Sequence, residues 1–212
     1  MKTYTVNRIE ESTLNINGLG NSTPWKTAEL LTDFIAPWDL EFKPKVAFKA
    51  LWDVNNFYFC FHVEDQEVYL NTTDDSIESI GSSDRVELFF RKDKDLNPYY
   101  CLEMDSSARL MDFKAKAGKV FDFDWNWSKH GIELKSNVNA NGYTLEGVVS
   151  ISVLKELKLL YNSQLEVGIF AAKFKLTNET QRHPIWMSWV HPQVTEPNFH
   201  QPLTFGSLIL KG

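Results

Sequence analysis

The sequence predicts an all-β protein, an antiparallel sandwich of two sheets of the immunoglobulin or jelly-roll kind with one short helix. Two observations predict this class: short runs in which apolar and polar residues alternate, and turn residues that separate the runs. The strands do not alternate with helices, as they would in a parallel β-α-β fold. The candidate strands are Thr3–Ile9, Val46–Trp52, Phe57–Glu64, Arg85–Arg91, Tyr99–Asp105, Arg109–Lys116, Ile132–Val138, Tyr143–Ile151, Leu165–Leu176 and Phe205–Lys211.

The segments between these strands contain one hairpin signal, one helix and several long loops. Asn141-Gly142 stands between two alternating runs and predicts a tight hairpin turn. Ser152–Leu159 predicts a helix of one or two turns with Ser152 as its N-cap. Neither a repeat nor a linker rich in Pro, Gly or Ser interrupts the chain, so we expect a single domain over residues 1–212. The long loops are expected at Tyr69–Ser83, Phe121–Gly131 and Trp186–Pro202.

Charge and hydropathy limit the classes of partner. The net charge is −6 and Lys and Arg do not cluster, which argues against nucleic acid as a ligand. No apolar run approaches the roughly 20 residues of a membrane-spanning helix. The first residues lack the apolar segment of a signal peptide, which fits a cytoplasmic protein or an exported one without its leader. We expect a monomer, because an acidic single sandwich is usually one.

Alternation also assigns side chains to the two faces of the central strands. In Arg85–Arg91, the apolar even-numbered residues suit the core and leave Arg85 and Glu87 on the second face. In Tyr99–Asp105, the second face carries Tyr99 and Glu103. Two interpretations remain open from alternation alone. This face is either a solvated surface with cross-strand ion pairs, or a platform on which charged groups and aromatic rings hold a sugar.

Several motifs, in order, carry a resemblance to a known family. They are Asn17-Gly18 followed by Trp25, the run Val46–Asp53 followed by Phe57-Tyr58, Val63-Glu64-Asp65, Asp84–Phe89 (DRVELF), Ser188-Trp189 with Pro192, and Phe199–Gly206 ending in F-G. This order resembles the family 9 carbohydrate-binding modules and the wider DOMON-like group of sandwiches. The resemblance covers nearly the whole chain, from about Asn17 to Leu210.

The resemblance implies non-catalytic binding of an oligo- or polysaccharide, for example at the ends of plant glucan or xylan chains, in support of carbohydrate catabolism. Members of the family hold a terminal sugar unit between two aromatic rings while polar side chains contact its hydroxyls. The polar positions correspond here to Glu87 and Glu103, and the second ring to Phe199. The first ring should precede Asp84, where this chain has Ile80-Gly81-Ser82-Ser83. The expected ligand-binding residues are Arg85, Glu87, Tyr99, Glu103, Phe199 and His200, with Trp125 or Trp127 supplying the missing ring. The alternatives are a ligand that differs from that of the family's characterised members, or a site that has lost binding.

Other functions stay open at this stage. Glu87 and Glu103 would also suit a weak glycoside hydrolase or an accessory domain of one, and a separate glycoside hydrolase is the expected protein partner. Some DOMON-like relatives bind haem b for electron transfer, for which this chain offers Met104, Met111 or Met187 with His183 or His200. The resemblance also implies a structural calcium ion, with Asp65 as the candidate ligand.

Overall fold

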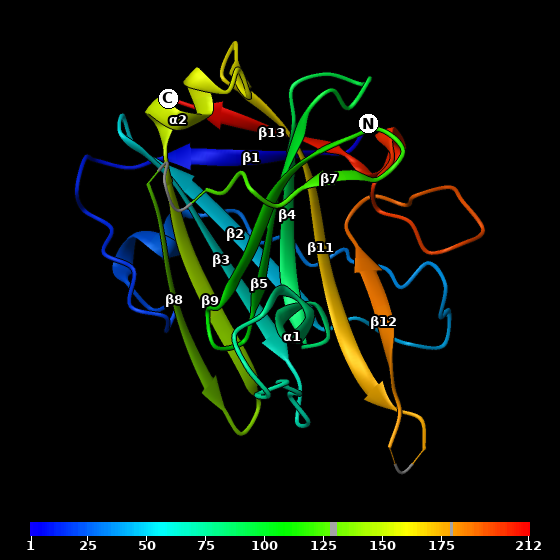
Figure 1. Ribbon diagram of the computed structural model, residues 1–212. Helices are drawn as coiled ribbons and strands as arrows, with labels where there is room; N and C mark the ends of the chain where they lie inside the picture. Colours follow the sequence, from blue (N-terminus) through cyan, green and yellow to red (C-terminus); the bar gives the residue numbers. More distant parts are fainter. Residues whose placement is uncertain (128–130, 179) are drawn as a thin grey trace.

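The computed structural model describes residues 1–127, 131–178 and 180–212 (Figure 1). Within them the strands form one curled sheet of thirteen strands, in the order β7-β6-β5-β4-β11-β13-β1-β2-β3-β9-β8, while β10 and β12 pair with β11. The strands are β1 (Thr3–Arg8), β2 (Val46–Trp52), β3 (Asn56–Glu64), β4 (Arg85–Arg91), β5 (Tyr99–Asp105), β6 (Leu110–Lys116), β7 (Val120–Asp122), β8 (Ile132–Asn139), β9 (Gly142–Ser150), β10 (Leu160–Tyr161), β11 (Gln164–Leu176), β12 (Arg182–Ser188) and β13 (Gly206–Lys211).

The all-β prediction is confirmed, and two of its details are corrected. The sheet is continuous rather than divided in two, because β13 and β1 join the half that contains β4, β5 and β11 to the half that contains β2, β3 and β9. The sheet is also not wholly antiparallel, since β1 runs parallel to both β13 and β2. Alternation identifies a strand but not its partner, and β1 and β13 come from opposite ends of the chain.

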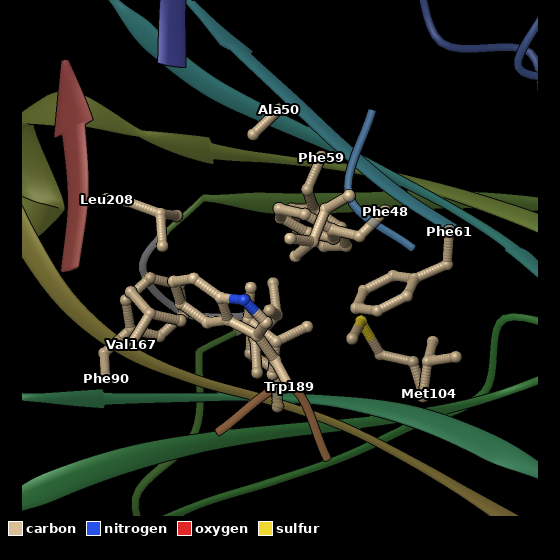
Figure 2. Close-up of a cluster of buried hydrophobic side chains, with 14 of the residues drawn as sticks. Phe48, Ala50, Phe59, Phe61, Phe90, Met104, Val167, Trp189 and Leu208 are labelled. Carbon is tan, nitrogen blue, oxygen red and sulfur yellow. The ribbon is translucent and has the colours of Figure 1, made fainter. Parts of the chain in front are cut away.

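The main core lies between the two halves of the curled sheet. Phe57 of β3 and Phe90 of β4 meet there with ring centroids 6.3 Å apart and planes at 88°. Figure 2 shows Phe61 of β3 and Met104 of β5 pointing toward one another across the same space. Each such side chain, when fully buried, contributes about 1.5–3 kcal/mol relative to exposure. This core packs against one face of β4 and β5 and stabilises both strands, so the residues on their opposite face are not needed for the main core.

Each half of the sheet also carries a smaller apolar cluster on its outer face. The cluster on the β4–β5–β11 half, here called the outer cluster, consists of Ile80, Phe89, Leu96, Tyr99, Cys101, Met111, Phe113, Ala115, Phe170, Phe199 and Phe205. The cluster on the β2–β3 half consists of Leu14, Ile16, Trp25, Leu51, Tyr58 and Cys60. Both outer faces are therefore covered by chain segments, and β4 and β5 are buried along their whole length.

The helices in the described part of the chain are short, and none is long and apolar enough to cross a membrane. The predicted helix Ser152–Leu159 is present as Ile151–Glu156, with Ser150 rather than Ser152 as its N-cap. A second α-helix lies inside the segment predicted as the loop Tyr69–Ser83, where the Ser76 hydroxyl accepts a hydrogen bond from the amide of Ser79. The helical elements are α1 (Ile77–Gly81), α2 (Ile151–Glu156), η1 (Thr23–Thr27) and η3 (Pro202–Thr204).

The structure corrects the other two predicted loops and the hairpin turn. Strand β7 begins at Val120 and extends into the expected loop Phe121–Gly131, of which residues 128–130 lie outside the described residues, and β12 includes Trp186. In the β8–β9 hairpin, Asn139 pairs with Gly142, so the turn is Ala140-Asn141. Gly142 opens β9 with φ at 138°, and a Cβ there would lie 1.9 Å from the carbonyl oxygen of Val63. Close approach of β3 therefore requires this glycine.

Candidate carbohydrate-binding site

The floor of the candidate site is made by neighbouring residues of β4 and β5. Glu87 pairs directly with Glu103, and Arg85 is two residues from Glu87 on the same face of β4. All three side chains are buried, with residue exposures of 5% for Arg85, 1% for Glu87 and 4% for Glu103. The structure thus brings together the three charged residues that the sequence predicted, and it places them beneath other side chains rather than on a solvated surface.

Arg85 is held by both carboxylates and by the end of α1. Its Nε donates a hydrogen bond of 2.9 Å to Oε2 of Glu103, and its Nη1 donates one of 2.6 Å to the carbonyl oxygen of Gly81. The same Nε lies 2.9 Å from Oε1 of Glu87. Nη2 has no hydrogen-bond partner among the described residues, so one donor of the guanidinium is available to a ligand.

One carboxylate oxygen of Glu87, Oε1, accepts no aligned hydrogen bond from the described residues. Although Oε1 lies close to Nε of Arg85, the aligned hydrogen bond of that nitrogen goes to Glu103. Oε1 of Glu87 is buried and has no hydrogen-bond partner among the described residues. Buried polar atoms are almost always hydrogen-bonded, so an oxygen that has an ion-pair contact but accepts no aligned hydrogen bond calls for an explanation. A ligand that donates a hydrogen bond would supply one.

Two carboxyl groups share a single guanidinium in this cluster. Burial, together with the nearby charge of Glu103, raises the pKa of Glu87 to about 8, and Arg85 opposes both effects. Burial also raises the pKa of Glu103, against the attraction of Arg85. Near neutral pH the two glutamates therefore hold a proton as well as an ion pair.

A cavity of about 140 Å³ opens above this floor. It is far smaller than the roughly 300–1,000 Å³ of sites for drug-sized ligands, so it suits one small unit of a ligand. Its lining is polar at the floor and rich in rings around the sides. The walls are formed by Trp38, Lys119, Trp186, Pro197, Asn198, Phe199 and His200.

Trp186 reaches the site through the pairing of β11 with its neighbours. Ala172 of β11 pairs with Arg85 on one side and with Trp186 of β12 on the other, so the three residues share one row and one face. The small side chain of Ala172 leaves room for the guanidinium of Arg85 to lie 5.3 Å from the Trp186 ring centroid. Trp186 is only partly buried, and the expectation of Trp186 within a loop is corrected.

Phe199 and Trp38 form the neighbouring wall. Phe199 stacks on Phe170 of β11 with ring centroids 4.2 Å apart and planes at 11°, and it is only 6% exposed. Trp38 leans on Phe199 at 5.4 Å and donates a hydrogen bond of 3.1 Å from Nε1 to the carbonyl oxygen of Val194. Phe199 lines the cavity as predicted, but most of its ring area is used within the outer cluster.

His200 lines the cavity, and Tyr99 lies behind it. The Tyr99 hydroxyl and Nδ1 of His200 are 2.9 Å apart, and the imidazole stacks on Phe89 at 4.9 Å. Burial, with the positive charges of Lys119 and Arg85, lowers the pKa of His200 to about 3. His200 is therefore neutral at physiological pH. Tyr99 is fully buried and outside the cavity lining, so it positions His200 instead of forming a wall.

The two tryptophans predicted to supply the missing ring lie elsewhere. Trp127 is fully buried in the main core, where it contacts Phe90 and Tyr100 at centroid distances of 5.5 Å and 6.1 Å. Trp125 packs beside it at 4.7 Å from Tyr100. Phe90 and Tyr100 belong to the core face of β4 and β5, opposite Glu87. Neither tryptophan lines the cavity, because the chain after β7 crosses to the core side.

The residues around Asp65 do not fit a calcium ion. Its side chain forms an ion pair with Lys173, and its Oδ1 accepts a hydrogen bond of 2.9 Å from the amide of Glu67. Calcium takes six to eight oxygen ligands, whereas the Asp65 carboxylate is already paired with the Lys173 ammonium group. Among the described residues, no group of three or more His, Cys, Asp or Glu side chains could hold a metal ion.

The methionines considered for haem are not arranged as a ligand set around His200. Met104 and Met187 are buried in the main core, whereas His200 lies on the outer face of β4 and β5. Met111 is in the outer cluster, where it lies under Gly81 of α1. A cavity of about 140 Å³ is also much too small for a haem macrocycle.

Sequence reasoning missed Trp38 and Trp186 as wall residues. Trp186 had a usable signal, because the alternating residues from Arg182 onward could have been assigned to a strand. Trp38 lies in a segment without strand or helix and contacts the site only through the tertiary fold.

Comparisons with known proteins identify a matching family and similar structures. The family described as carbohydrate family 9 binding domain-like matches residues 16–212. A candidate carbohydrate-binding protein from Bacteroides uniformis ATCC 8492 has a similar structure, with a TM-score of 0.75, 17% identity and 99% of each chain covered. No match was found among curated proteins.

Two further similar structures are those of a family 9 carbohydrate-binding module from Caldicellulosiruptor kristjanssonii. In complex with glucose it has a TM-score of 0.63 and 15% identity, over 100% of this chain and 96% of that one. In complex with cellotriose the values are 0.62 and 16%, over 100% and 94%. These identities support the fold, while the family match extends over nearly the whole sequence. The chain belongs to the carbohydrate family 9 binding domain-like family.

Proposed function

We propose that this protein is a non-catalytic carbohydrate-binding module that holds one terminal sugar unit of an oligo- or polysaccharide in the cavity above Glu87. The observation that carries the proposal is the buried acceptor Oε1 of Glu87, which contacts Nε of Arg85 at 2.9 Å, accepts no aligned hydrogen bond from the described residues and stands at the floor of that cavity. A sugar hydroxyl is a donor that fits such an atom. It accepts as well, so it also fits the free Nη2 of Arg85.

The walls suit the other property of a sugar. A pyranose presents C–H groups on its faces, and these pack favourably on aromatic rings. Trp186 and Trp38 are partly exposed rings at the cavity and are the candidates for this contact, in place of the expected Trp125 or Trp127. Because the cavity is small and only a few contacts are available, we expect dissociation constants from micromolar to millimolar, about −8 to −4 kcal/mol.

The arrangement of the two carboxyl groups favours binding over hydrolysis. A glycosidase places its carboxyl groups on either side of the scissile bond. Glu87 and Glu103 instead lie side by side on the floor, each 2.9 Å from the same Arg85 nitrogen, so both would contact one side of a ligand. A supporting role beside a separate glycoside hydrolase in carbohydrate catabolism is consistent with this proposal.

Calorimetric titration with glucose and cellotriose tests the proposal, since the similar modules were solved with these two sugars. We expect binding by the native protein and its loss in Glu87→Ala. Glu166→Ala is a matched control, because Glu166 also pairs with an arginine of β4, at 2.7 Å from Nε of Arg91, but does not line the cavity. The control should bind normally. Full affinity in a folded Glu87→Ala protein would refute the assignment of the site.

A further inference from the structure

A second, larger cavity adjoins the one above Glu87. Its volume is about 900 Å³, and it shares Trp38, Trp186 and Pro197 with the smaller cavity. Trp38 and Trp186 therefore line both spaces, with the small polar cavity on one side of them and a wide groove on the other. The remaining groove residues are Asp39, Leu40, Lys175, Leu176, Thr177, His183, Pro184 and Ile185.

The groove follows the free edge of β12. Among the described strands β12 pairs only with β11, and Figure 1 shows it at one side of the molecule. At its end, the amide and carbonyl of Ser188 exchange hydrogen bonds of 2.9 Å with Ile35. Because edge-facing residues alternate in an antiparallel strand, the main-chain groups of Trp186 and Pro184 also point to this edge. The segment from Ile35 to Leu40 thus diverges from β12 and leaves main-chain polar groups along the groove.

The chemistry of this edge fits a sugar chain better than a peptide strand. Pro184 has no N–H to donate, and a proline on an edge strand opposes pairing with another strand. Sugar hydroxyls need no regular ladder and can use isolated carbonyl groups and the side chains of Asp39, Lys175 and His183. Leu40 and Leu176 are 80% and 48% exposed, which offers apolar surface to C–H faces.

We propose that this groove binds the further units of a glycan chain whose terminal unit occupies the small cavity, so that the protein recognises an oligosaccharide rather than a monosaccharide. The inference rests on the proposed function of the cavity above Glu87. Its own support is the shared wall: a chain that leaves the small cavity past Trp38 and Trp186 enters the groove directly. A volume of about 900 Å³ has room for several units, whereas the small cavity does not.

The experiment is a calorimetric series with glucose, cellobiose, cellotriose and cellotetraose. We expect affinity to rise by about tenfold or more from glucose to cellotriose. The double variant Leu40→Ser/Leu176→Ser changes only groove residues, and we expect it to reduce this gain to less than about threefold while glucose affinity is unchanged. Leu19→Ser is the matched control, because Leu19 has the same 48% exposure as Leu176 but lines a cavity beside Cys60 and Thr144.

The outcomes separate the two proposals. Equal affinity for all four sugars, or a gain that survives the double variant, overturns the groove assignment and leaves the small cavity intact. Loss of glucose binding in the double variant also overturns it, because the groove would then not be a separate subsite. If the native protein binds none of the four sugars, the proposed function fails for this class of glycan, and the groove proposal fails with it.

Discussion

Two buried glutamates, one on the outer face of each half of the sheet, differ in how many hydrogen bonds their carboxylates accept. Glu146 of β9 is fully buried on the outer face of the β2–β3–β9 half. Its Oε2 accepts hydrogen bonds from the amides of Asn17 and Gly18 at 3.0 Å and 2.5 Å, and its Oε1 accepts one of 2.6 Å from the indole of Trp25. Glu87 of β4 is equally buried, yet its Oε1 has only the ion-pair contact with Arg85 at 2.9 Å and accepts no aligned hydrogen bond from the described residues.

The difference lies in what covers each carboxylate. Above Glu146, the segment from Leu14 to Trp25 brings main-chain and indole donors to both carboxylate oxygens. Above Glu87, the covering residues are rings, a proline, Asn198 and an exposed lysine, and a cavity remains over the carboxylate. Burial of a carboxylate thus does not by itself indicate function. A buried carboxylate with its acceptors used fixes a segment of chain, whereas one with an unused acceptor under a cavity is available to a ligand.

Removing the Glu146 carboxylate should have the largest effect of these substitutions, and the effect should be on stability and not on sugar affinity. Glu146→Ala leaves the buried donors of Gly18 and Trp25 and the partly buried amide of Asn17 without an acceptor, and each buried donor left unsatisfied costs about 1–3 kcal/mol. At about 2–4 °C per kcal/mol for a chain of this size, the melting temperature should fall by roughly 10 °C in a calorimetric scan. Sugar affinity of the folded protein should not change. A stable Glu146→Ala protein, or one that remains folded but loses sugar binding, would break the comparison.

Substitutions of Trp186, beside Glu87, and of Trp25, beside Glu146, should also separate sugar affinity from stability. Trp186→Ala removes a partly exposed wall of the cavity, so we expect sugar affinity to fall by about tenfold, near 1.4 kcal/mol, with a small change in melting temperature. Titration calorimetry measures the loss. Trp25→Phe is the matched control, because Trp25 is 1% exposed and contacts Glu146. It should lower stability and leave affinity unchanged; the reverse pattern would contradict the assignment.

The floor of the candidate site was predictable because its geometry is local. The strand bounds Arg85–Arg91 and Tyr99–Asp105 were predicted as observed, and a period of two places Arg85 and Glu87 on one face wherever the strand goes. The resemblance to family 9 modules pointed to Glu87 and Glu103 as well. Alternation could not predict that Glu87 and Glu103 are buried, because the segments that cover them come from distant parts of the sequence.

Among the wall residues, Phe199 and His200 were named from the sequence, but Trp38 and Trp186 were not, because they reach the cavity only through the tertiary fold. Trp186 reaches Arg85 only because β11 stands between β12 and β4, with a small residue, Ala172, at the crossing point. Trp125 and Trp127 were attractive as exposed loop aromatics, but the path of the chain after β7 turns both toward the core. The joining of the two halves through β1 and β13 depends on pairing between the chain ends, which no local pattern records.

The pH dependence of stability should sharpen the comparison further. The pKa of Glu87 rises from its ordinary value of 4.5 to about 8 in the folded protein. Between these values the native state keeps a proton that the unfolded state has released, so this group's contribution to stability is full below pH 4.5 and is lost as pH rises through 8. Glu87→Gln resembles the protonated form and cannot ionise. We therefore expect equal melting temperatures near pH 4 and a variant that is more stable than the native protein near pH 8.5. Each kcal/mol of that difference should raise the melting temperature of the variant by about 2–4 °C.

The control for this measurement is a glutamate that pairs with the other arginine of β4. Glu166→Gln, measured in parallel, should show no such crossover, because Glu166 is partly exposed and lies outside the cavity. Parallel curves for Glu87→Gln and the native protein would mean that Glu87 is ionised in the fold at neutral pH. The unused acceptor would then carry a full charge rather than a shared proton, and a ligand would meet two carboxylates with one guanidinium between them.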